Sequence, residues 1–416
     1  MVQISSESFT VHGRTYRPPA KPVVVICIDG CADEYLSVSL SKDRMPNLAR
    51  MAAQGYRGLV RGALPSFTNV NNASIVTGMP PSVTGISGNF FLDPETGEEV
   101  MMNSADYLRC GTLLAEAARM GRKVGMVTAK EKLREILSHD LEGIAFSAEK
   151  ANEAGMETHG IEDVETLVGA PTPEIYSGEA SLFVLRSGVA LLEAERADFL
   201  YLSLTDYMQH KYGPETPESL DFYGAMDVEI GRLLNLGAVV GMTADHGMNA
   251  KQTSDSHVIY LESVLTEQFG GVRVICPITD PYVVHHGALG GLVMVHLTDP
   301  AQTETVARFI LEMDGITEVY DRDMAARKLE LPGDRIGDLV VLSGRDVVVG
   351  RTPEYHDLSV LEGGLRSHGG RYEEMVPMVL SGSLNPVYAA KAQGDPRNFD
   401  IFEFTCNGMI CEEDHV

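Results

Sequence analysis

Residues 236–248 read Leu-Gly-Ala-Val-Val-Gly-Met-Thr-Ala-Asp-His-Gly-Met, an apolar run that leads into an aspartate and a histidine side by side. The apolar part predicts a buried strand, and Asp245, His246 and Gly247 predict a tight loop at its end. Such a tripeptide also occurs in ordinary loops, where aspartate caps a turn and glycine takes a positive φ. A loop that presents two metal-binding side chains is favoured because three other strand ends in the chain finish in aspartate, threonine or histidine.

The composition limits the class of function. The chain has 416 residues, enough for two lobes or for one domain with a sizeable insertion, and its 44% hydrophobic and 22% charged residues are typical of a globular protein. Its net charge of −26 argues against nucleic acid as a partner, because nucleic-acid binding needs a basic face. An anionic substrate would need local cations, either metal ions or Lys and Arg side chains.

The cysteines and the N-terminus bear on location. Cys27 and Cys31 lie four residues apart without a second close pair, which disfavours a structural zinc knuckle. Residues 1–19 are polar and lack the apolar segment of a signal peptide, so we expect a cytoplasmic protein with reduced thiols. No apolar run approaches the roughly 20 residues that span a membrane, and we expect no membrane partner.

The first predicted strand ends in an acidic side chain. The β-branched run over 22–28 predicts a buried parallel strand that ends at Asp29, where open α/β sheets bind their ligands. A turn aspartate before Gly30 explains this residue equally well. We expect a helix over 45–54 and a strand over 56–63 to follow.

Hydroxyl and amide side chains crowd the start of the next predicted helix, which ends at Gly78. Thr68 is there either an N-cap or a nucleophile, because helix N-termini favour phosphate and a lowered nucleophile pKa. The loop over 82–91 is rich in Gly and Ser and contains Asn89. It is a candidate phosphate-binding loop, with a simple surface loop as the default interpretation.

Two lysines follow the strand predicted over 123–128. Lys130 and Lys132 lie two residues apart at its carboxyl end. Most lysine pairs are simply solvated, but this location makes them candidates for holding a substrate anion.

An aspartate and a histidine follow the strand predicted over 199–204. Asp206 and His210 are four residues apart. If they span one helical turn, both side chains lie on one face and can share a metal ion. The alternative is an aspartate N-cap beside an incidental histidine. A helix over 217–234 then leads back to the strand before Asp245.

The sequence pattern changes near residue 255. Short strand-like segments surround one helix at 301–313, and residues 255–360 therefore predict an α+β cap insertion. Residues 1–254 and 361–416 predict a core that binds metal. The strands expected in the cap cover 272–276, 282–285, 292–296, 316–319 and 338–343.

Histidines also occur near the end of the cap and beyond it. Adjacent His285 and His286 fit a pair on the surface. His368 lies in a second His-Gly loop, before a last strand at 375–381. We recognise no signal in the acidic tail that follows.

Seven side chains at strand ends combine into one ligand set. Carboxylates and imidazoles bind zinc and neighbouring divalent metals, and seven ligands are too many for one tetrahedral ion but suit two. The seven residues are Asp29, Thr68, Asp206, His210, Asp245, His246 and His368. A metal-bound Thr68 would lose its proton more readily and become a nucleophile, and two metal ions about 4 Å apart clamp a phosphoryl group for in-line displacement.

The order of these motifs resembles the alkaline phosphatase superfamily, and within it the nucleotide pyrophosphatase/phosphodiesterase branch. Segments 65–72, 128–134 and 205–211 further resemble the phosphonoacetate hydrolases of that branch. The resemblance covers nearly the whole chain. It implies an α/β fold with an alkaline-phosphatase-like core, in which helices flank a mostly parallel sheet, and a smaller α+β cap.

The resemblance also implies a role for each residue. Asp206, His210 and His368 would hold one zinc ion, and Asp29, Thr68, Asp245 and His246 would hold the second. Thr68 would attack phosphorus and form a phosphothreonine. Substrate contacts are expected from Thr68, Asn89, Lys130, Lys132 and His210, with the two lysines on the carboxylate. The expected partner is a small phosphonate that is cleaved to phosphate and acetate, and a homodimer is left open.

Three other functions remain open. A nucleotide pyrophosphatase or phosphodiesterase on the same site would need an aromatic pocket for a base, which Phe67, Phe90 or Phe91 would supply. A metal-dependent phosphoglycerate mutase normally has serine in place of Thr68 and a differently placed insertion. A non-catalytic, zinc-stabilised protein is disfavoured because structural zinc sites are closed and usually rich in cysteine.

Overall fold

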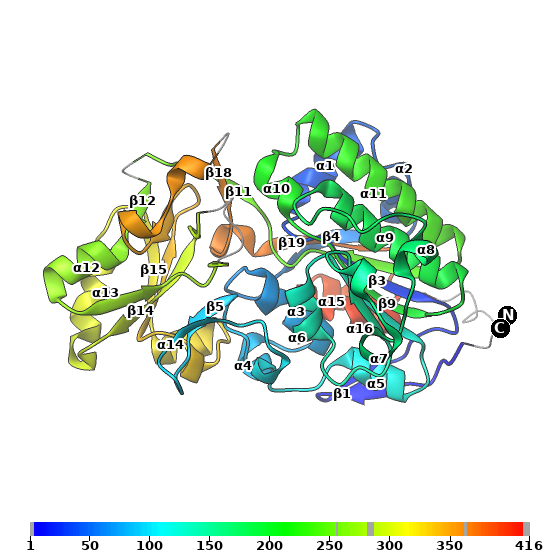
Figure 1. The fold of residues 1–416 in the computed structure, drawn as a ribbon, viewed down its shortest axis with the longest axis horizontal. Helices are drawn as coiled ribbons and strands as arrows, with labels where there is room; N and C mark the ends of the chain where they lie inside the picture. The colour runs from blue at the N-terminus through cyan, green and yellow to red at the C-terminus, as the bar shows by residue number, and fades with distance from the viewer. Residues whose placement is uncertain (1–3, 255–256, 281–286, 362–363, 411–416) are drawn as a thin grey trace.

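The computed structural model describes residues 4–254, 257–280, 287–361 and 364–410. Figure 1 shows two lobes side by side, a larger one near both termini and a smaller one around β14 and β15. The larger lobe contains a seven-stranded sheet and the smaller lobe a four-stranded sheet. The strand expected over 282–285 and the histidine pair at its end, His285 and His286, lie outside the described residues.

The seven-stranded sheet organises the larger lobe. From edge to edge its strands are β4 (Tyr56–Arg61), β19 (Met375–Leu380), β10 (Val239–Thr243), β3 (Val23–Cys27), β9 (Phe199–Ser203), β7 (Val124–Thr128) and β8 (Ile144–Ser147). The last five strands pair in parallel, and β19 runs antiparallel to both of its neighbours. The prediction of a mostly parallel sheet is therefore confirmed.

Helices cover both faces of this sheet, which is why every residue of β3, β9 and β7 is buried. In Figure 1, α1 (Asp33–Ser41), α2 (Pro46–Gln54), α9 (Gly178–Glu193) and α11 (Pro217–Asn235) lie above it. Below it lie α3 (Thr68–Thr77), α5 (Leu113–Arg119), α6 (Glu131–Leu137) and α16 (Ile401–Glu403). No helix among the described residues combines the length and the apolarity needed to cross a membrane.

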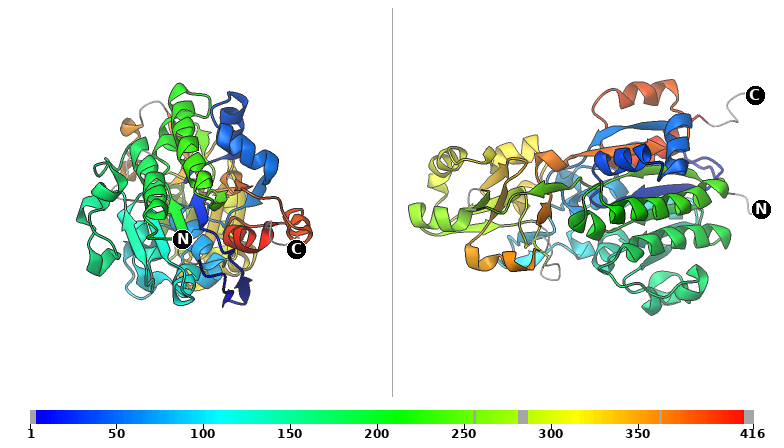
Figure 2. Two further views of the ribbon diagram at one scale, coloured as in Figure 1. Left: turned by 90° about the vertical axis from the view of Figure 1, so that its right-hand side faces the viewer. Right: turned by 90° about the horizontal axis from the view of Figure 1, so that it is seen from above.

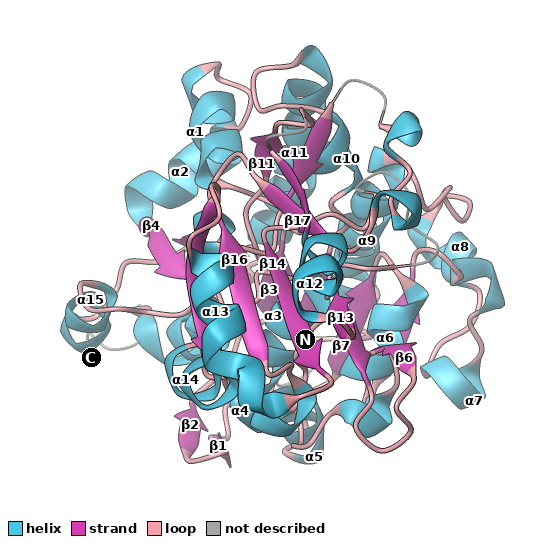
Figure 3. Cartoon of the chain, turned by 90° about the vertical axis from the view of Figure 1, so that its left-hand side faces the viewer, coloured by secondary structure: helices cyan, strands magenta, loops and turns pink. Residues whose placement is uncertain are grey.

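The smaller lobe is an antiparallel sheet with helices packed against it, as the α+β prediction for the cap requires (Figure 3). Its strand order is β13 (Val272–Ile275), β14 (Leu292–Leu297), β16 (Leu339–Ser343) and β15 (Ile316–Asp321). The helices are α12 (Leu261–Phe269), α13 (Thr303–Leu311) and α14 (Arg322–Lys328). Apolar side chains of α12 and α13, such as Leu265 and Ile310, join Val293 and Val341 of the sheet in one buried cluster.

Two short strands connect the lobes. β11 (Asn249–Lys251) leaves the larger lobe just after the Asp245–His246 loop, and β18 (Leu365–Ser367) returns directly to His368. They pair antiparallel with Lys251 opposite Leu365. Figure 1 labels these strands between the lobes, and the view from above in Figure 2 shows the two lobes one after the other along the length of the molecule. We call β11 and β18 the connecting strands.

Candidate active site

The structure brings six of the predicted ligands together in two groups at the carboxyl end of the main sheet. One group is Asp206, His210 and His368, and the other is Asp29, Asp245 and His246. Within each group, one ligand atom from every residue lies within 4.8 Å of the others, and all six side chains are buried. The grouping matches the division into two metal sites that the resemblance implies.

Strand topology explains why residues so far apart in sequence meet. Asp29, Asp206 and Asp245 follow the adjacent parallel strands β3, β9 and β10, whose carboxyl ends share one edge of the sheet. Gly30 permits the closest approach, because its φ is +70° and a Cβ there would lie 3.0 Å from the Asp206 Cβ. The Asp206 loop therefore packs directly on the backbone that carries Asp29.

Asp206 and His210 form the helical turn that their spacing predicts. The His210 amide donates to the Asp206 carbonyl oxygen at 2.9 Å, at the start of α10 (Tyr207–Lys211). The imidazole Nε2 lies 2.9 Å from the Asp206 carboxylate. Both side chains consequently point into the same space, as a shared metal ion would require.

The tautomers of the three histidines also suit metal binding. In His210, His246 and His368, Nδ1 lies 2.7, 2.9 and 2.8 Å respectively from a backbone carbonyl oxygen. A carbonyl oxygen can only accept a hydrogen bond, so Nδ1 carries a proton, and a metal ion that replaces any proton on Nε2 would meet the Nε2 lone pair. Metal-ligating histidines are held by this kind of contact.

The buried carboxylates of the site would carry negative charge that needs a compensating cation. Burial raises the pKa of Asp245 well above its ordinary value, and the neighbouring Asp29 carboxylate raises it further. Both oxygens of Asp29 are buried and have no hydrogen-bond donor among the described residues, with His246 Nε2 at 3.2 Å and Lys130 Nζ at 3.7 Å. Divalent cations would compensate this charge, so the residues present fit two metal ions.

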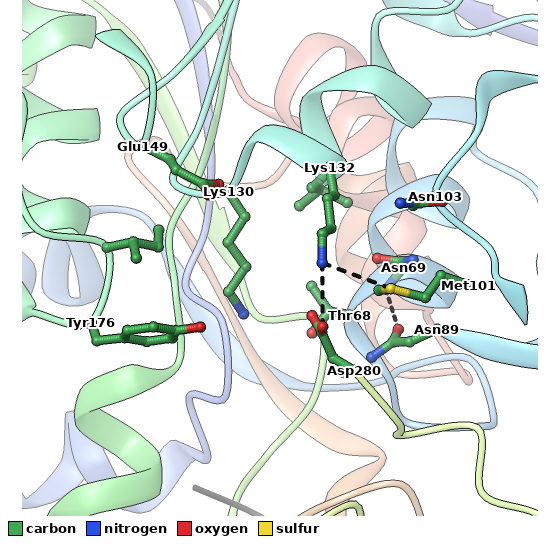
Figure 4. Close-up of a pocket in the computed structure, with 12 residues that line it drawn as sticks. Thr68, Asn69, Asn89, Met101, Asn103, Lys130, Lys132, Glu149, Tyr176 and Asp280 are labelled. Carbon is green, nitrogen blue, oxygen red and sulfur yellow. Dashed lines mark hydrogen bonds and ion pairs between the residues drawn. The ribbon is translucent and has the colours of Figure 1, made fainter. Parts of the chain in front are cut away.

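Thr68 lies beside this cluster at the first residue of α3. Its hydroxyl is 3.4 Å from His246 Nε2, and the residue is 6% exposed at the edge of a cavity. The next residue, Asn69, donates its backbone N–H to the Asn89 side-chain oxygen at 3.1 Å. That contact fixes the Asn89 amide so that its NH₂ group is left for a ligand in the cavity (Figure 4).

The cavity in front of Thr68 has a volume of about 290 Å³. Lys130 and Lys132 line it together with Thr68 and Asn89, and both lysine side chains extend into the space beside Thr68 (Figure 4). Lys130 lies 3.1 Å from the Asp206 carboxylate, which with Asp29 keeps its pKa raised although burial alone would lower it. Lys132 lies 3.3 Å from Asp280, a residue of the predicted cap.

Asn72 is an important residue that sequence reasoning missed. It is fully buried on α3, and its NH₂ group donates to the Asp245 carboxylate at 3.1 Å and to the Thr68 carbonyl oxygen at 3.0 Å. Its oxygen accepts from Tyr201 at 2.6 Å and Ser203 at 2.8 Å on β9. The Thr68-x-x-x-Asn72 spacing, one helical turn, was the available signal for a shared role.

The C-terminal segment also reaches the site, although its sequence predicted nothing. Asn398 is fully buried and donates to the Asn71 side-chain oxygen at 2.9 Å and to the Ala244 carbonyl oxygen at 3.1 Å. It therefore joins the helix of the nucleophile candidate to the loop of Asp245. No local pattern marks such a long-range contact.

Comparison with known proteins identifies the family. The model of the type I phosphodiesterase / nucleotide pyrophosphatase family matches residues 23–371. The chain belongs to this family. The match runs from β3 into the segment after His368, so it includes all seven predicted metal ligands.

Solved structures show closer similarity within the family. A phosphonoacetate hydrolase from Sinorhizobium meliloti 1021, crystallised with phosphonoacetate, is 42% identical with a TM-score of 0.91, and the match covers 97% of this chain and 99% of that one. The same enzyme with phosphonoformate gives a TM-score of 0.92. Murine ectonucleotide pyrophosphatase/phosphodiesterase 5, at 16% identity and a TM-score of 0.62, shares the fold over 93% of this chain and 94% of its own.

Curated relatives are more distant. An uncharacterised pyrophosphatase/phosphodiesterase of Schizosaccharomyces pombe is 24% identical over 63% of this chain and 53% of its own length. The human ectonucleotide pyrophosphatase/phosphodiesterase family member 1 is 27% identical over 59% of this chain and 25% of its own. The chain thus spans about half of the yeast relative and a quarter of the human one.

Proposed function

We propose that the chain is a two-zinc hydrolase that cleaves the carbon–phosphorus bond of phosphonoacetate to give acetate and phosphate. The observation that carries the proposal is the position of Lys130 and Lys132, which share one cavity with Thr68 beside the two groups of candidate ligands. Similarity at 42% identity to an enzyme crystallised with phosphonoacetate supports it.

The metal assignment follows the two groups. Asp206, His210 and His368 would hold one zinc ion, and Asp29, Asp245, His246 and the Thr68 hydroxyl would hold the other. When bound, the ions would lower the pKa of the Thr68 hydroxyl and of a water molecule and would neutralise phosphoryl charge.

Thr68 is the proposed nucleophile. Its oxygen attacks phosphorus, a phosphothreonine forms, and the carbon–phosphorus bond breaks with its electron pair on carbon. Water then hydrolyses the phosphothreonine, which releases phosphate and restores the hydroxyl. The Asn89 NH₂ group is placed to donate to a phosphoryl oxygen, and the N-terminus of α3 favours the same negative charge.

The two lysines would stabilise the leaving group, which is poor because carbon must accept the electron pair of the broken bond. Carbon accepts the electron pair only if the charge spreads into the neighbouring carboxylate as an enolate-like species, which is then protonated to acetate. Ammonium groups beside that carboxylate stabilise charge that grows in the transition state. Lys130 and Lys132 supply these cations in a protein whose net charge is −26.

Nucleotide hydrolysis is the alternative that family membership favours. The aromatic pocket expected for a base does not come from Phe67, Phe90 or Phe91, which are all buried in packing contacts. Among the described residues that line the cavity, which exclude 281–286, Tyr176 is the one aromatic side chain. The described part of the lining therefore offers a base one ring face, whereas it offers a carboxylate two ammonium groups.

Turnover of three substrates by the zinc-loaded chain separates these functions. We expect phosphate and acetate in equal amounts from phosphonoacetate, with much slower release from phosphonopyruvate and bis-p-nitrophenyl phosphate. Efficient diester cleavage without phosphonate turnover would instead assign the chain to the phosphodiesterases. Sedimentation of the same sample tests whether the chain forms the homodimer that the sequence leaves open.

A further inference from the structure

The two connecting strands each adjoin a candidate metal ligand. His246 lies three residues before β11, and His368 directly follows β18. Their imidazole rings stack with centroids 3.6 Å apart and an angle of 7° between the planes. These rings belong to different metal groups, so their relative placement sets the geometry between the two proposed zinc ions.

A buried carboxylate lies behind both histidine loops. The Glu373 backbone oxygen accepts the N–H of Gly247 at 2.7 Å, next to His246. Its side-chain oxygen Oε2 accepts the N–H of Gly370 at 3.0 Å, two residues after His368. One residue therefore holds the backbone of both loops, although its side chain is not among the candidate ligands or the residues that line the cavity.

Lys251 of β11 pairs with this carboxylate. Its ammonium lies 2.8 Å from Glu373 Oε1, and the two side chains are 1% and 0% exposed. The same ammonium donates to the Arg345 carbonyl oxygen of the predicted cap at 2.7 Å. The cap touches the site again where the Gly291 N–H donates to the His368 carbonyl oxygen at 2.9 Å.

We infer that Lys251 and Glu373 are a positioning pair. The pair orients the His246 and His368 loops and couples the geometry of these loops to the position of the cap. The inference rests on the proposed two-metal site. A buried ion pair gains little stability over a well-packed apolar pair, because both charges lose their hydration. Its strict geometry, with each group bonded to more than one partner, is what an apolar pair could not supply.

The test is Glu373→Gln, a change that keeps the shape and removes the charge. We expect zinc titration of the metal-free variant against a chelator to give at least a tenfold loss of affinity for one zinc equivalent, as for other residues that orient ligands. We also expect kcat to fall at least tenfold while the KM for phosphonoacetate changes less than threefold. Glu318→Gln is the matched control, because it removes the same charge from the Arg371–Glu318 pair between the lobes. Within the described structure the Glu318 carboxylate accepts from Arg371 and Tyr320 and from no backbone N–H of the histidine loops, so the zinc affinity of this variant should equal that of the wild type.

Glu373→Gln leaves the Lys251 charge buried without its partner, so this variant could lose activity by unfolding. A second variant separates that effect from a loss of positioning. Lys251→Met combined with Glu373→Gln removes that charge and should recover the melting temperature while zinc affinity stays low. Wild-type zinc affinity and kcat in either folded variant would overturn the positioning role. If the wild-type chain binds two zinc ions but leaves phosphonoacetate intact, the proposed function fails and the zinc titrations still decide this inference.

Discussion

The wall of the site that carries the candidate metal ligands differs in construction from the wall that carries the two lysines. The candidate ligands are buried and follow strands of the main sheet or a connecting strand, and each histidine is anchored through Nδ1. The side chains of Lys130 and Lys132 are 26% and 34% exposed. They extend from the start of α6, and Asp280 approaches them from the cap.

This difference separates chemistry from substrate choice. Side chains fixed by the sheet cannot move without disturbing the core, so they suit phosphoryl transfer, which needs exact placement of the reacting atoms. Side chains on connecting segments can be exchanged at little cost in stability. We therefore expect substitutions on the ligand wall to abolish turnover of every substrate, and substitutions on the lysine wall to change which substrate is used.

Loss of the nucleophile should have the largest effect. Thr68→Ala removes the protein oxygen proposed to attack phosphorus, so we expect kcat to fall by about 10⁴-fold or more for all substrates. Both zinc ions should remain, as measured by metal analysis after dialysis. Thr68→Ser keeps a hydroxyl and should keep at least a hundredth of the activity. Turnover that survives in Thr68→Ala would remove the threonine from the mechanism.

Loss of a metal ligand should follow. His368→Ala should retain one zinc ion instead of two and lose about 10³-fold in kcat/KM with phosphonoacetate and with bis-p-nitrophenyl phosphate alike. His356→Ala is the matched control, because this buried histidine of the predicted cap also bonds a backbone carbonyl but lies outside both groups. Two bound zinc ions in His368→Ala would contradict the assignment of this residue.

Lys130→Ala tests the other wall. Loss of one cation that stabilises transition-state charge should lower kcat/KM for phosphonoacetate by about 10²-fold. The rate with bis-p-nitrophenyl phosphate, which has no carboxylate, should change less than about threefold, because the nucleophile and the metal ligands are untouched. Equal losses on both substrates would show that Lys130 serves the carboxylates of Asp206 and Asp29, which it also contacts, and the contrast between the walls would fail.

The same contrast explains what the sequence could predict. Asp29, Asp206 and Asp245 follow apolar runs that predict buried strands, and the topology of the parallel strands brings them to one edge of the sheet. Asp280 and Tyr176 line the cavity from segments that have no hydrophobic periodicity, so no local sequence pattern predicts their place in the site. The anchoring contacts of Asn72 and Asn398 join residues more than a hundred positions apart, and only the folded chain reveals them.

Substitution of Asp280 should give the smallest effect. It tests how the cap influences the binding of the substrate carboxylate by Lys132. The Asp280 carboxylate lies 3.3 Å from the Lys132 ammonium, in a partly exposed pair that a substrate carboxylate would have to displace or share. Pairs of this kind are weak, so Asp280→Asn should lower the KM for phosphonoacetate about two- to fivefold with little change in kcat. Glu149→Gln, on another side of the same cavity and away from Lys132, is the charge-matched control and should lower the KM less. A rise in KM in Asp280→Asn would mean that the cap holds Lys132 in its binding position, which would make the cap a part of the substrate site and the lysine wall as firmly built as the ligand wall.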